Sequence, residues 1–188
     1  MTSFIGETGK ARARRERDSF FEKYTVGQGL DIGCGLDPLT PDCDKYDFIF
    51  GNKDATLLPE ISKQYSWVYS SHCLEHLKDP SAALKRWWEV VIPGGFLIVA
   101  VPHRDLYEKR LKLPSHWNRD HKWFFLPEEH VNSFTLGLRQ LVQDNIPGGT
   151  IEYLLVCNEG WVDVGADKHS CGEYQIEIVV RKVQESRP

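Results

Sequence analysis

The feature that most restricts the fold is an uninterrupted aliphatic run, GFLIVAV, at residues 95–101. A strand with one solvent-facing side alternates apolar and polar residues, whereas a continuous aliphatic run suits a strand buried on both faces of a parallel sheet. Shorter runs occur at 29–32 (GLDI), 46–50 (YDFIF) and 66–71 (SWVYSS). We therefore expect four strands of a mostly parallel sheet.

Helical patterns separate or flank these strands. One apolar stripe, with the spacing i, i+3, i+4, i+7 of an amphipathic helix, consists of Leu84, Trp87, Trp88 and Val91. A later stripe consists of Phe134, Leu138, Leu141 and Val142. Residues 8–24 are charged and lack proline, which predicts an N-terminal helix that docks through its last turn.

Two late segments, 150–157 and 174–182, alternate well enough to form an antiparallel hairpin at a sheet edge. Strands that alternate with helices indicate βαβ units. The sequence therefore predicts an α/β fold: a doubly wound, mostly parallel Rossmann-like sheet with helices on both faces and an antiparallel hairpin at one edge. A length of 188 residues favours one domain, 1–188.

The composition excludes several classes of protein. A net charge of −4 argues against a broad nucleic-acid-binding surface, and no apolar run approaches the length of a membrane span. The five cysteines are odd in number and contain no C-x-x-C pair, which favours reduced thiols in the cytoplasm. No apolar segment at the N-terminus resembles a signal peptide.

A cluster of arginines, ARARRERD, is the one strongly basic stretch. We prefer to interpret it as a solvated helix face. The alternative is a basic arm over an anionic ligand. The cluster comprises Arg12, Arg14, Arg15 and Arg17.

The segment GLDIGCGLDP places a G-x-G turn, Gly33 and Gly35, directly after a predicted strand that contains Asp31. Glycines there allow a positive φ and a close approach of a ligand at the carboxyl edge of the sheet. The third glycine of a dinucleotide fingerprint is absent, as is the Lys-Ser/Thr pair of a phosphate-binding loop. Acidic residues at both ends of the loop disfavour a pyrophosphate and tolerate a cationic ligand.

This segment resembles the first motif of the class I, Rossmann-like, S-adenosylmethionine-dependent methyltransferases, in particular the type 11-like group. The segments DATLLP, YSSHCLEHLKDP and VVIPGGFLIVAVP resemble the following motifs in the same order. The resemblance covers roughly residues 26–102. It implies S-adenosyl-L-methionine as cofactor and divides the chain into an N-terminal helical arm (1–25), a cofactor-binding core (26–102), a substrate or lid segment (103–130), and a C-terminal helix with edge strands (131–182).

The resemblance also implies roles for individual residues. Asp31 and the turn Gly33–Cys34–Gly35 would hold the methionine end. Asp47 is the candidate for the ribose hydroxyls, and Asp44 is the fallback if the strand register differs. Asp54 and Ala55 would contact the adenine, Leu57 and Leu58 would form its apolar wall, and Ser70, Ser71 and His72 would lie under the sulfonium. The sequence departs from the family at 36–45, where two prolines and three aspartates predict a shortened or missing helix.

The stretch SSHCLEHL (70–77) contains the spacing H-x-x-E-H, which one class of zinc hydrolase also uses. A zinc site needs a third protein ligand, which several residues could supply. The resemblance instead implies a strand-to-helix corner, with His72 at the strand exit, Leu74 in the core and His76 as a structural histidine. We therefore expect no metal.

Residues 102–130 follow the strand that borders the methyl group and are rich in His, Arg, Asp, Trp and Tyr. That mixture suits a hydroxylated acceptor such as a saccharide. The alternative is an ordered surface loop anchored by Trp117, Trp123, Phe124 and Phe125. The candidate general bases are His103, Asp105, His116, Asp120 and His121. We favour His103 oriented by Asp105, and His121 is its competitor.

The predicted function is therefore methyl transfer from S-adenosylmethionine, with O-methylation of a small hydroxylated acceptor such as a sugar or glycan precursor as the expected reaction. The rival hypotheses are a non-catalytic cofactor- or partner-binding domain, a zinc hydrolase and a nicotinamide-dependent redox enzyme. The expected partner is a small-molecule or saccharide acceptor, with no nucleic acid and no membrane. The oligomeric state stays open.

Overall fold

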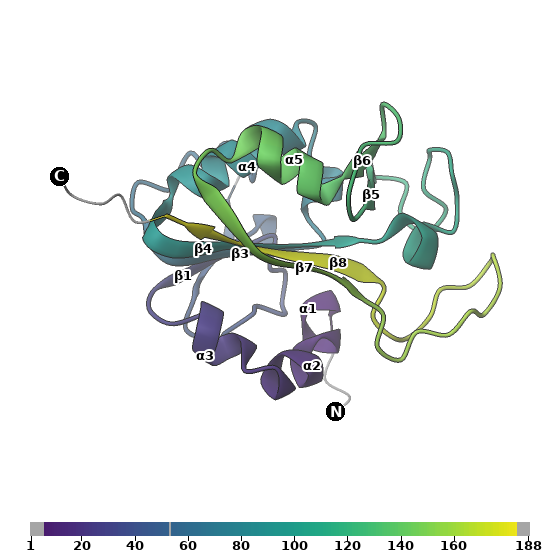
Figure 1. Cartoon of the computed structure of the whole chain (residues 1–188), viewed down its shortest axis with the longest axis horizontal. Coiled ribbons are helices and arrows are strands. Elements are labelled where there is room, and N and C mark those ends of the chain that lie inside the picture. Colours follow the sequence, from purple (N-terminus) through teal and green to yellow (C-terminus); the bar gives the residue numbers. More distant parts are fainter. Residues whose placement is uncertain (1–5, 53, 184–188) are drawn as a thin grey trace.

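Six strands form the central sheet of the computed structural model, which describes residues 6–52 and 54–183. Their order is β2-β1-β3-β4-β8-β7 (Figure 1). The strands are β1 (Gly29–Ile32), β2 (Asp44–Tyr46), β3 (Tyr65–Ser71), β4 (Val91–Pro102), β7 (Gly149–Cys157) and β8 (Gln175–Lys182). The first three pairings are parallel, whereas β4–β8 and β8–β7 are antiparallel. The predicted mostly parallel sheet with an antiparallel hairpin at one edge is confirmed.

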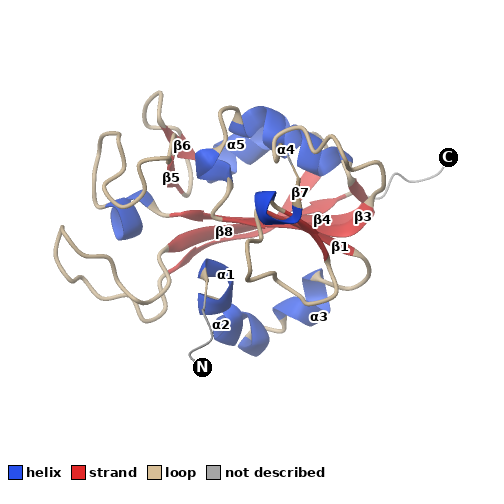
Figure 2. Ribbon diagram, turned by 180° about the vertical axis from the view of Figure 1, so that it is seen from behind, coloured by secondary structure: helices blue, strands red, loops and turns tan. Residues whose placement is uncertain are grey.

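Helices cover both faces of this sheet, as predicted (Figures 1 and 2). One face carries α4 (Pro80–Glu89) and α5 (Leu138–Asn145). The other carries the N-terminal helices α1 (Glu7–Lys10), α2 (Arg12–Arg17) and α3 (Phe20–Tyr24). No helix of the described residues is long and apolar enough to cross a membrane.

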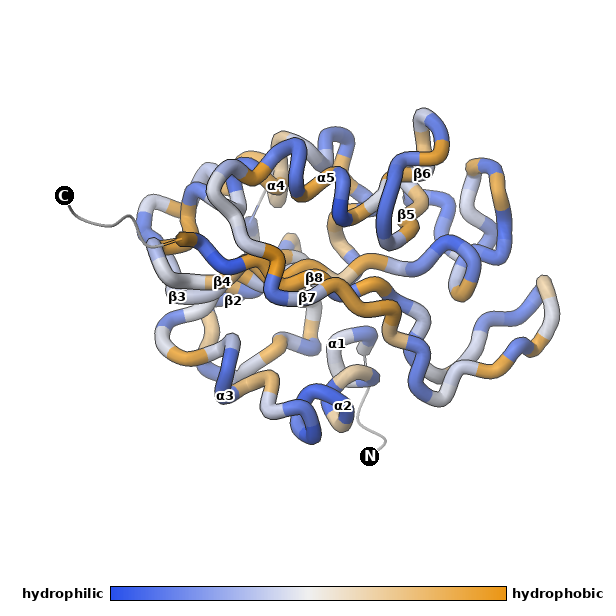
Figure 3. Tube along the Cα trace, in the orientation of Figure 1, coloured by the Kyte–Doolittle hydropathy of each residue, from blue (hydrophilic) through white to orange (hydrophobic). Residues whose placement is uncertain are grey.

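The aliphatic run in β4 is buried on both faces. Leu97, Val99 and Val101 belong to the same apolar cluster as Trp87 of α4, whereas Ile98 packs on the opposite face. Figure 3 shows this distribution, with hydrophobic residues concentrated along the central strands. Two-sided burial explains why this run lacks the polar alternation of a half-exposed strand.

Helix α4 begins as the sequence indicates and ends earlier. Asp79 caps it by accepting a hydrogen bond from the Ala82 amide at 2.9 Å, and Pro80 occupies the first turn, where a missing N–H costs nothing. The predicted stripe is buried as far as Trp88. Val91 lies in β4, so the stripe's last member is a strand residue.

The N-terminal segment is three short helices rather than the single helix predicted over 8–24. Ser19 separates α2 from α3 with a left-handed φ of 54°. Arg14 and Arg15 are buried and form ion pairs with Glu173 and Glu177. The interpretation as a solvated face is therefore wrong for these two arginines and correct for Arg12 and Arg17, which are exposed. Residues 1–5 of the predicted arm, like 184–188, lie outside the described residues.

Two predicted element boundaries are wrong. The strand expected at 46–50 ends at Tyr46, and the 3₁₀ helix η1 (Phe48–Phe50) follows. Asp47 starts this turn by accepting from the Ile49 amide at 3.0 Å, and Gly51 ends it with a φ of 87°. Phe134 lies outside α5, because β6 (Thr135–Gly137) comes between them.

Residues 33–43, all of which the structure describes, contain no helix. The sequence predicted a shortened or missing helix here, and this prediction is confirmed. The N-terminal helices pack on the same face of the sheet as this loop, and the Gly9 amide of α1 donates to Asp37 of the loop at 2.7 Å. The arm therefore supports the loop that follows β1.

The remaining segments gather beyond one end of the sheet (Figure 1). They include the π-helix η3 (Arg104–Glu108) and the parallel pair β5 (Phe124–Leu126) and β6. The loop between β7 and β8 reaches the same region, because the Trp161 indole donates to the Leu106 carbonyl at 3.1 Å. Phe124 and Phe125 are buried, as expected for anchors of this segment.

Candidate functional site

A cavity of about 480 Å³ opens at the carboxyl ends of the parallel strands. Gly33 follows β1, Asp47 follows β2 and His72 follows β3, and all three line it. This edge of an open α/β sheet is where such folds bind their ligands, and the volume is that of a small-molecule site. The remaining lining residues are Tyr46, Phe48, Asn52, Asp54, Ala55, Cys73, His76, Leu77, Asp120 and Lys122.

Half of the predicted cofactor residues line this cavity. They are Gly33, Asp47, Asp54, Ala55 and His72. The other five do not line it: Asp31, Cys34, Gly35, Ser70 and Ser71. These five are buried or half-buried around the turn after β1 and at the end of β3. Phe48, Asn52, Cys73 and Leu77 were missed by the sequence reasoning, because Phe48 was assigned to a strand and no role was expected of the other three side chains.

The turn after β1 has the backbone geometry that its glycines permit. Gly33 and Gly35 have φ values of 74° and 52°, in the left-handed region. A Cβ on Gly33 would lie 2.7 Å from the Cβ of Cys73, so a side chain there would collide with the neighbouring corner. The requirement for glycine at this wall of the cavity is thus both conformational and steric.

Asp47 rather than Asp44 lies at the cavity. The Asp47 carboxylate accepts the Gly35 amide at 3.0 Å through Oδ2 and the Ile49 amide at 3.0 Å through Oδ1. Each carboxylate oxygen keeps a second lone pair for a ligand. Asp44 faces away, where its carboxylate bonds to the Tyr65 hydroxyl at 2.8 Å and pairs with Lys63.

The segment expected at the adenine is only partly as predicted. Asp54 lines the cavity, and its Oδ1 accepts the Thr56 amide at 2.8 Å. Neither Leu57 nor Leu58 lines the cavity, and Leu58 is fully buried in the core. Phe48 lines the cavity instead, with 76% of its surface exposed.

Asp31 lies beneath the turn, with none of its surface exposed. Its Oδ2 accepts the Leu39 amide at 2.7 Å, and Oδ1 has no hydrogen-bond partner among the described residues. Burial raises the pKa of Asp31 to about 7, although the Leu39 amide and the Arg15 guanidinium oppose the rise. A buried carboxylate oxygen without a donor is suited to a cationic or N–H-bearing ligand.

The histidine of the strand exit has an unusual backbone. His72 has a φ of 51°, and its Nε2 lies 3.2 Å from Oε1 of Gln175 in β8. Burial lowers the pKa of His72 to about 4, so its imidazole is neutral at pH 7. Ser70 at the end of β3 is turned into the sheet, because its hydroxyl donates to the Ile32 carbonyl at 3.0 Å.

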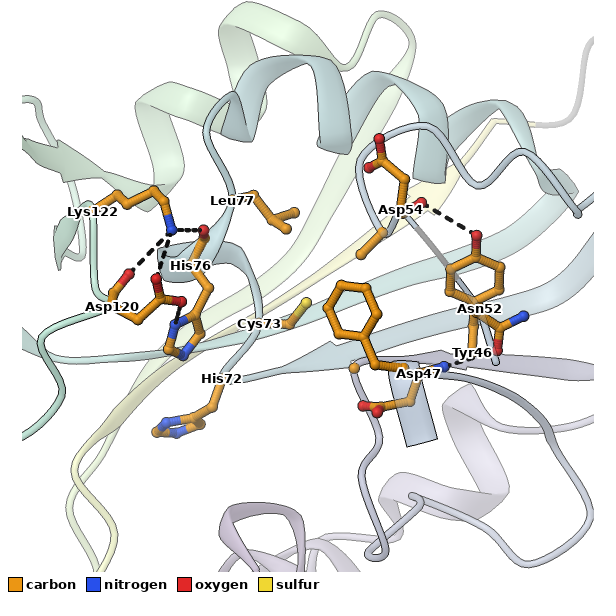
Figure 4. Close-up of a pocket in the computed structure, with 13 residues that line it drawn as sticks. Tyr46, Asp47, Asn52, Asp54, His72, Cys73, His76, Leu77, Asp120 and Lys122 are labelled. Atoms are coloured by element: carbon orange, nitrogen blue, oxygen red, sulfur yellow. Dashed lines mark hydrogen bonds and ion pairs between the residues drawn. The ribbon is translucent and has the colours of Figure 1, made fainter. Parts of the chain in front are cut away.

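The opposite end of the cavity is built from His76, Asp120 and Lys122. Asp120 accepts from Nδ1 of His76 at 3.0 Å and from the Lys122 ammonium at 3.1 Å. The same ammonium donates to the His76 carbonyl at 2.5 Å. Figure 4 shows the two ends, with Asp47 and Asp54 on one side, His76, Asp120 and Lys122 on the other, and Cys73 between them.

His103 does not line this cavity, although it follows β4 directly. Its Nδ1 accepts the Asp105 amide at 3.1 Å, so that nitrogen carries no proton and its lone pair is occupied. The Asp105 carboxylate does not orient the imidazole, because it pairs with Arg104 at 2.7 Å. The structure therefore does not assemble the favoured pair at the cavity. His116 is exposed on the surface.

His121, the competing candidate, lies behind His76. Its side chain is 3% exposed, and its Nδ1 lies 2.5 Å from Oε1 of Glu108. Its Nε2 lies 3.8 Å from Oε1 of Glu75. The rings of His76 and His121 meet edge to face, with their centroids 4.7 Å apart.

The H-x-x-E-H stretch forms a strand-to-helix corner in this structure. His72 and Cys73 follow β3, and the 3₁₀ helix η2 (Leu74–His76) precedes α4. Leu74 is fully buried, as expected. His72 and His76 therefore do not share a helical face, which the zinc-hydrolase spacing requires.

Comparison with known proteins decides the family. A model that describes a methyltransferase domain matches residues 6–145, which is most of the chain. The chain belongs to this methyltransferase family. It is an S-adenosylmethionine-dependent methyltransferase, and S-adenosylmethionine is its cofactor. A search of curated proteins by sequence found no match.

Solved structures share the fold of this methyltransferase at low sequence identity. The N-methyltransferase NodS from Bradyrhizobium japonicum WM9, in complex with S-adenosyl-L-homocysteine, is 16% identical over 93% of this chain and 87% of its own, with a TM-score of 0.59. The glycopeptide N-methyltransferase MtfA, complexed with sinefungin, is 13% identical over 98% and 89%, with a TM-score of 0.57. The [4+2]-cyclase SpnF is 16% identical over 92% and 81%, with a TM-score of 0.54.

The residues of the methyltransferase fit this cofactor. The orphaned Oδ1 of Asp31, the two left-handed glycines and the spare lone pairs of Asp47 offer acceptors and close backbone approach at one end. Phe48 offers an apolar surface nearby. No bound phosphate is required, which agrees with a loop flanked by carboxylates.

Proposed function

We propose that this methyltransferase transfers the methyl group to an oxygen of a small hydroxylated acceptor, such as a sugar or glycan precursor. The observation that carries the proposal is the polarity of the cavity. Carboxylates that suit the cofactor line one end, and a corner of histidine, aspartate and lysine lines the other. The two ends belong to one cavity, so a donor at the first end faces an acceptor at the second.

The cofactor side follows from the strand ends. Asp47 would hold the ribose hydroxyls, Asp54 and Ala55 would lie at the adenine, and the turn from Gly33 to Gly35 would support the methionine end. When bound, S-adenosylmethionine supplies a methyl group on a sulfonium, and the acceptor oxygen bonds to the methyl carbon as the carbon–sulfur bond breaks and its electron pair stays on sulfur.

The acceptor side supplies alignment and proton removal. In-line displacement depends mainly on positioning, and a hydroxyl also gains from assistance as its proton becomes acidic. The imidazole of His76 and the carboxylate of Asp120 are the groups at this end that can assist it, and His121 stands directly behind them. We propose that residues 103–130 form the acceptor side, since Asp120 and Lys122 come from this segment, and that 1–188 is one domain.

Incubation with the methyl-labelled cofactor and a panel of acceptors tests the proposal. The panel pairs each sugar with its amino-sugar analogue, and mass spectrometry locates the label. We expect label on oxygen. Label only on nitrogen would replace O-methylation by N-methylation, the activity named for NodS and MtfA. Cofactor binding with no product from any acceptor would favour the non-catalytic alternative.

We also propose a cytoplasmic location. All five cysteines are free thiols in the structure, which suits a reducing compartment. Measuring the thiol content of protein isolated from its native cells under alkylating conditions tests this proposal, and oxidised cysteines would contradict it.

A further inference from the structure

The carboxylate of Glu75 is the most conspicuous buried polar group outside the cofactor end of the cavity. The residue has none of its surface exposed, and neither carboxylate oxygen has a hydrogen-bond partner among the described residues. A buried carboxylate ordinarily accepts hydrogen bonds from nearby donors. Burying it without them costs on the order of several kcal/mol. Glu75 instead faces three imidazoles.

The hydrogen bonds of two of these imidazoles fix where their protons lie. Nδ1 of His121 bonds to the carboxylate of Glu108, and Nδ1 of His76 bonds to the carboxylate of Asp120. A carboxylate accepts, so each Nδ1 carries a proton and donates. In the neutral imidazole the other nitrogen, Nε2, then presents a lone pair. Both Nε2 atoms lie near the Glu75 carboxylate.

One ligand atom from each of three side chains thus lies in the same small region. Oε1 of Glu75 lies 3.8 Å from Nε2 of His76 and 3.8 Å from Nε2 of His121, and the three ligand atoms all lie within 4.8 Å of one another. Ligand atoms bound at about 2.1 Å to a tetrahedral ion stand about 3.4 Å apart. The separations of Oε1 from the two Nε2 atoms exceed this value by about 0.4 Å, and the separation between the two imidazoles' ligand atoms exceeds it by at most about 1.4 Å, so small side-chain rotations would bring the three atoms to coordination distance.

We propose that Glu75, His76 and His121 bind one divalent transition-metal ion. Two imidazoles and one carboxylate form a ligand set that suits zinc and related ions and leaves a position open for a further ligand. Glu108 and Asp120 would be the outer partners, since a metal-binding histidine typically donates its second ring N–H to a carboxylate. This ligand set differs from the H-x-x-E-H spacing, in which His72 would bind and the glutamate would act as a base.

The side of the proposed site that carries His76 borders the acceptor end of the cavity. His76 lines the cavity, whereas Glu75 and His121 lie behind it, so the ion would be reached from the cavity side. An ion there would bind an acceptor hydroxyl and lower its pKa, which removes the need for a strong base. This role in the reaction rests on the proposed O-methyl transfer, whereas the metal site itself does not.

Metal titration of the full chain tests the site without cofactor or acceptor. Protein freed of metal with a chelator is titrated with Zn²⁺ by isothermal titration calorimetry, and we expect one saturable ion per chain. Co²⁺ serves as a second probe, because its visible absorption reports nitrogen and oxygen ligation, whereas a cysteine ligand would add a strong near-ultraviolet band. No saturable Zn²⁺ binding, a thiolate band, or binding of Mg²⁺ without Zn²⁺ would each overturn the proposal.

Single substitutions assign the ligands. His76→Ala and His121→Ala should weaken Zn²⁺ by more than about 100-fold, and Glu108→Gln by about 10–100-fold, the usual effect of an outer partner. His116→Ala, an exposed histidine in the same segment, is the matched control and should bind like the unmodified protein. Circular dichroism checks the fold of each variant. Folded His76→Ala and His121→Ala proteins with unchanged affinity would exclude these residues as ligands.

The two proposals fail separately. Metal binding together with methylation only at nitrogen would support the metal site and contradict the proposed hydroxyl acceptor. Conversely, O-methylation that is unaffected by chelator, in a protein that binds no metal, would support the proposed acceptor and contradict the metal site.

Discussion

Arg15 and Glu177 form an ion pair in which neither side chain has any exposed surface. Nε of Arg15 donates to Oε2 of Glu177 at 2.9 Å, and Nη2 of Arg15 also donates to the Tyr69 hydroxyl at 2.9 Å. The other carboxylate oxygen of Glu177 accepts from Arg14 at 3.1 Å. The pair joins the N-terminal α2 to the middle of β8, so the arm is fixed to the sheet by charge as well as by apolar contacts.

Glu177→Gln should lower the free energy of unfolding by about 3–5 kcal/mol, because it leaves the Arg15 guanidinium buried without its counter-charge. Urea denaturation measures the change. The matched control is Glu159→Gln, which removes the exposed pair with Arg17 and should leave the free energy of unfolding nearly unchanged, because solvent screens this pair. Similar losses in the two variants would show that burial does not decide the effect.

Asp47→Ala should weaken binding of S-adenosylhomocysteine, since each hydrogen bond to a charged group contributes about 1.5–3 kcal/mol. Asp44→Ala is the matched control, because this carboxylate faces Lys63 and Tyr65 rather than the cavity. Calorimetry of both variants compares the two aspartates. If Asp44→Ala weakens binding and Asp47→Ala leaves the affinity unchanged, Asp44 rather than Asp47 would be the residue that contacts the ribose.

Asp31→Asn should change how stability depends on pH. Burial raises the folded-state pKa of Asp31 to about 7, above its unfolded value of about 3.9. Between these values the folded state holds a proton that the unfolded state has lost, so the contribution of Asp31 to stability falls as pH rises from about 4 to about 7 and is constant above. Nearby Asp37 and Asp47 add to the rise in pKa, and Arg15 opposes it.

The asparagine variant lacks this titration and can still accept the Leu39 amide. Its free energy of unfolding, relative to that of the original chain, should therefore increase from pH 4.5 to pH 7 by up to about 1.4 kcal/mol per pH unit and then level off. Urea denaturation of the cofactor-free proteins at several pH values measures the difference. A difference that is constant with pH would contradict a raised pKa at Asp31.

His76→Ala should lower turnover by roughly 10²–10⁴, the range for loss of a group that assists proton removal, because His76 lines the acceptor end of the cavity. His103→Ala should leave turnover nearly unchanged, because its Nδ1 is occupied by the Asp105 amide and the residue does not line the cavity. Methyl transfer from labelled cofactor measures both. A reversed order of effects would restore His103, the residue that the sequence favoured.

The parts of the fold that could be predicted from sequence have local causes. A strand buried on both faces must be apolar throughout, so residues 95–101 indicate both their conformation and their place in the sheet. Gly33 and Gly35 likewise indicate their turn, because few other residues tolerate a positive φ. Asp47 was a candidate through the family resemblance rather than through a local pattern, and the strand predicted over residues 46–50 ends just before it.

The parts that could not be predicted depend on contacts distant in sequence. The segment 103–130 has no hydrophobic period, so nothing in it indicates that His121 returns to Glu75. Arg14 and Arg15 carry the same charge pattern as a solvated helix face, and only the glutamates of a late strand bury them. From the sequence, Phe48 resembles a core residue of the strand predicted over 46–50. In the structure that strand ends at Tyr46, so Phe48 lies beyond it and is exposed.

The loop at 33–43 is ordered without a helix, and this changes its cooperativity. In a helix each hydrogen bond depends on the turn before it, so order is gained or lost together. Here three carboxylates act separately: Asp31 holds the Leu39 amide, Asp47 holds the Gly35 amide, and Asp37 holds Gly9. One of these three hydrogen bonds can break while the other two remain formed. The glycine wall of the cavity can therefore lose one of these contacts without losing the others, while the hydrogen bonds of the sheet beneath it are kept.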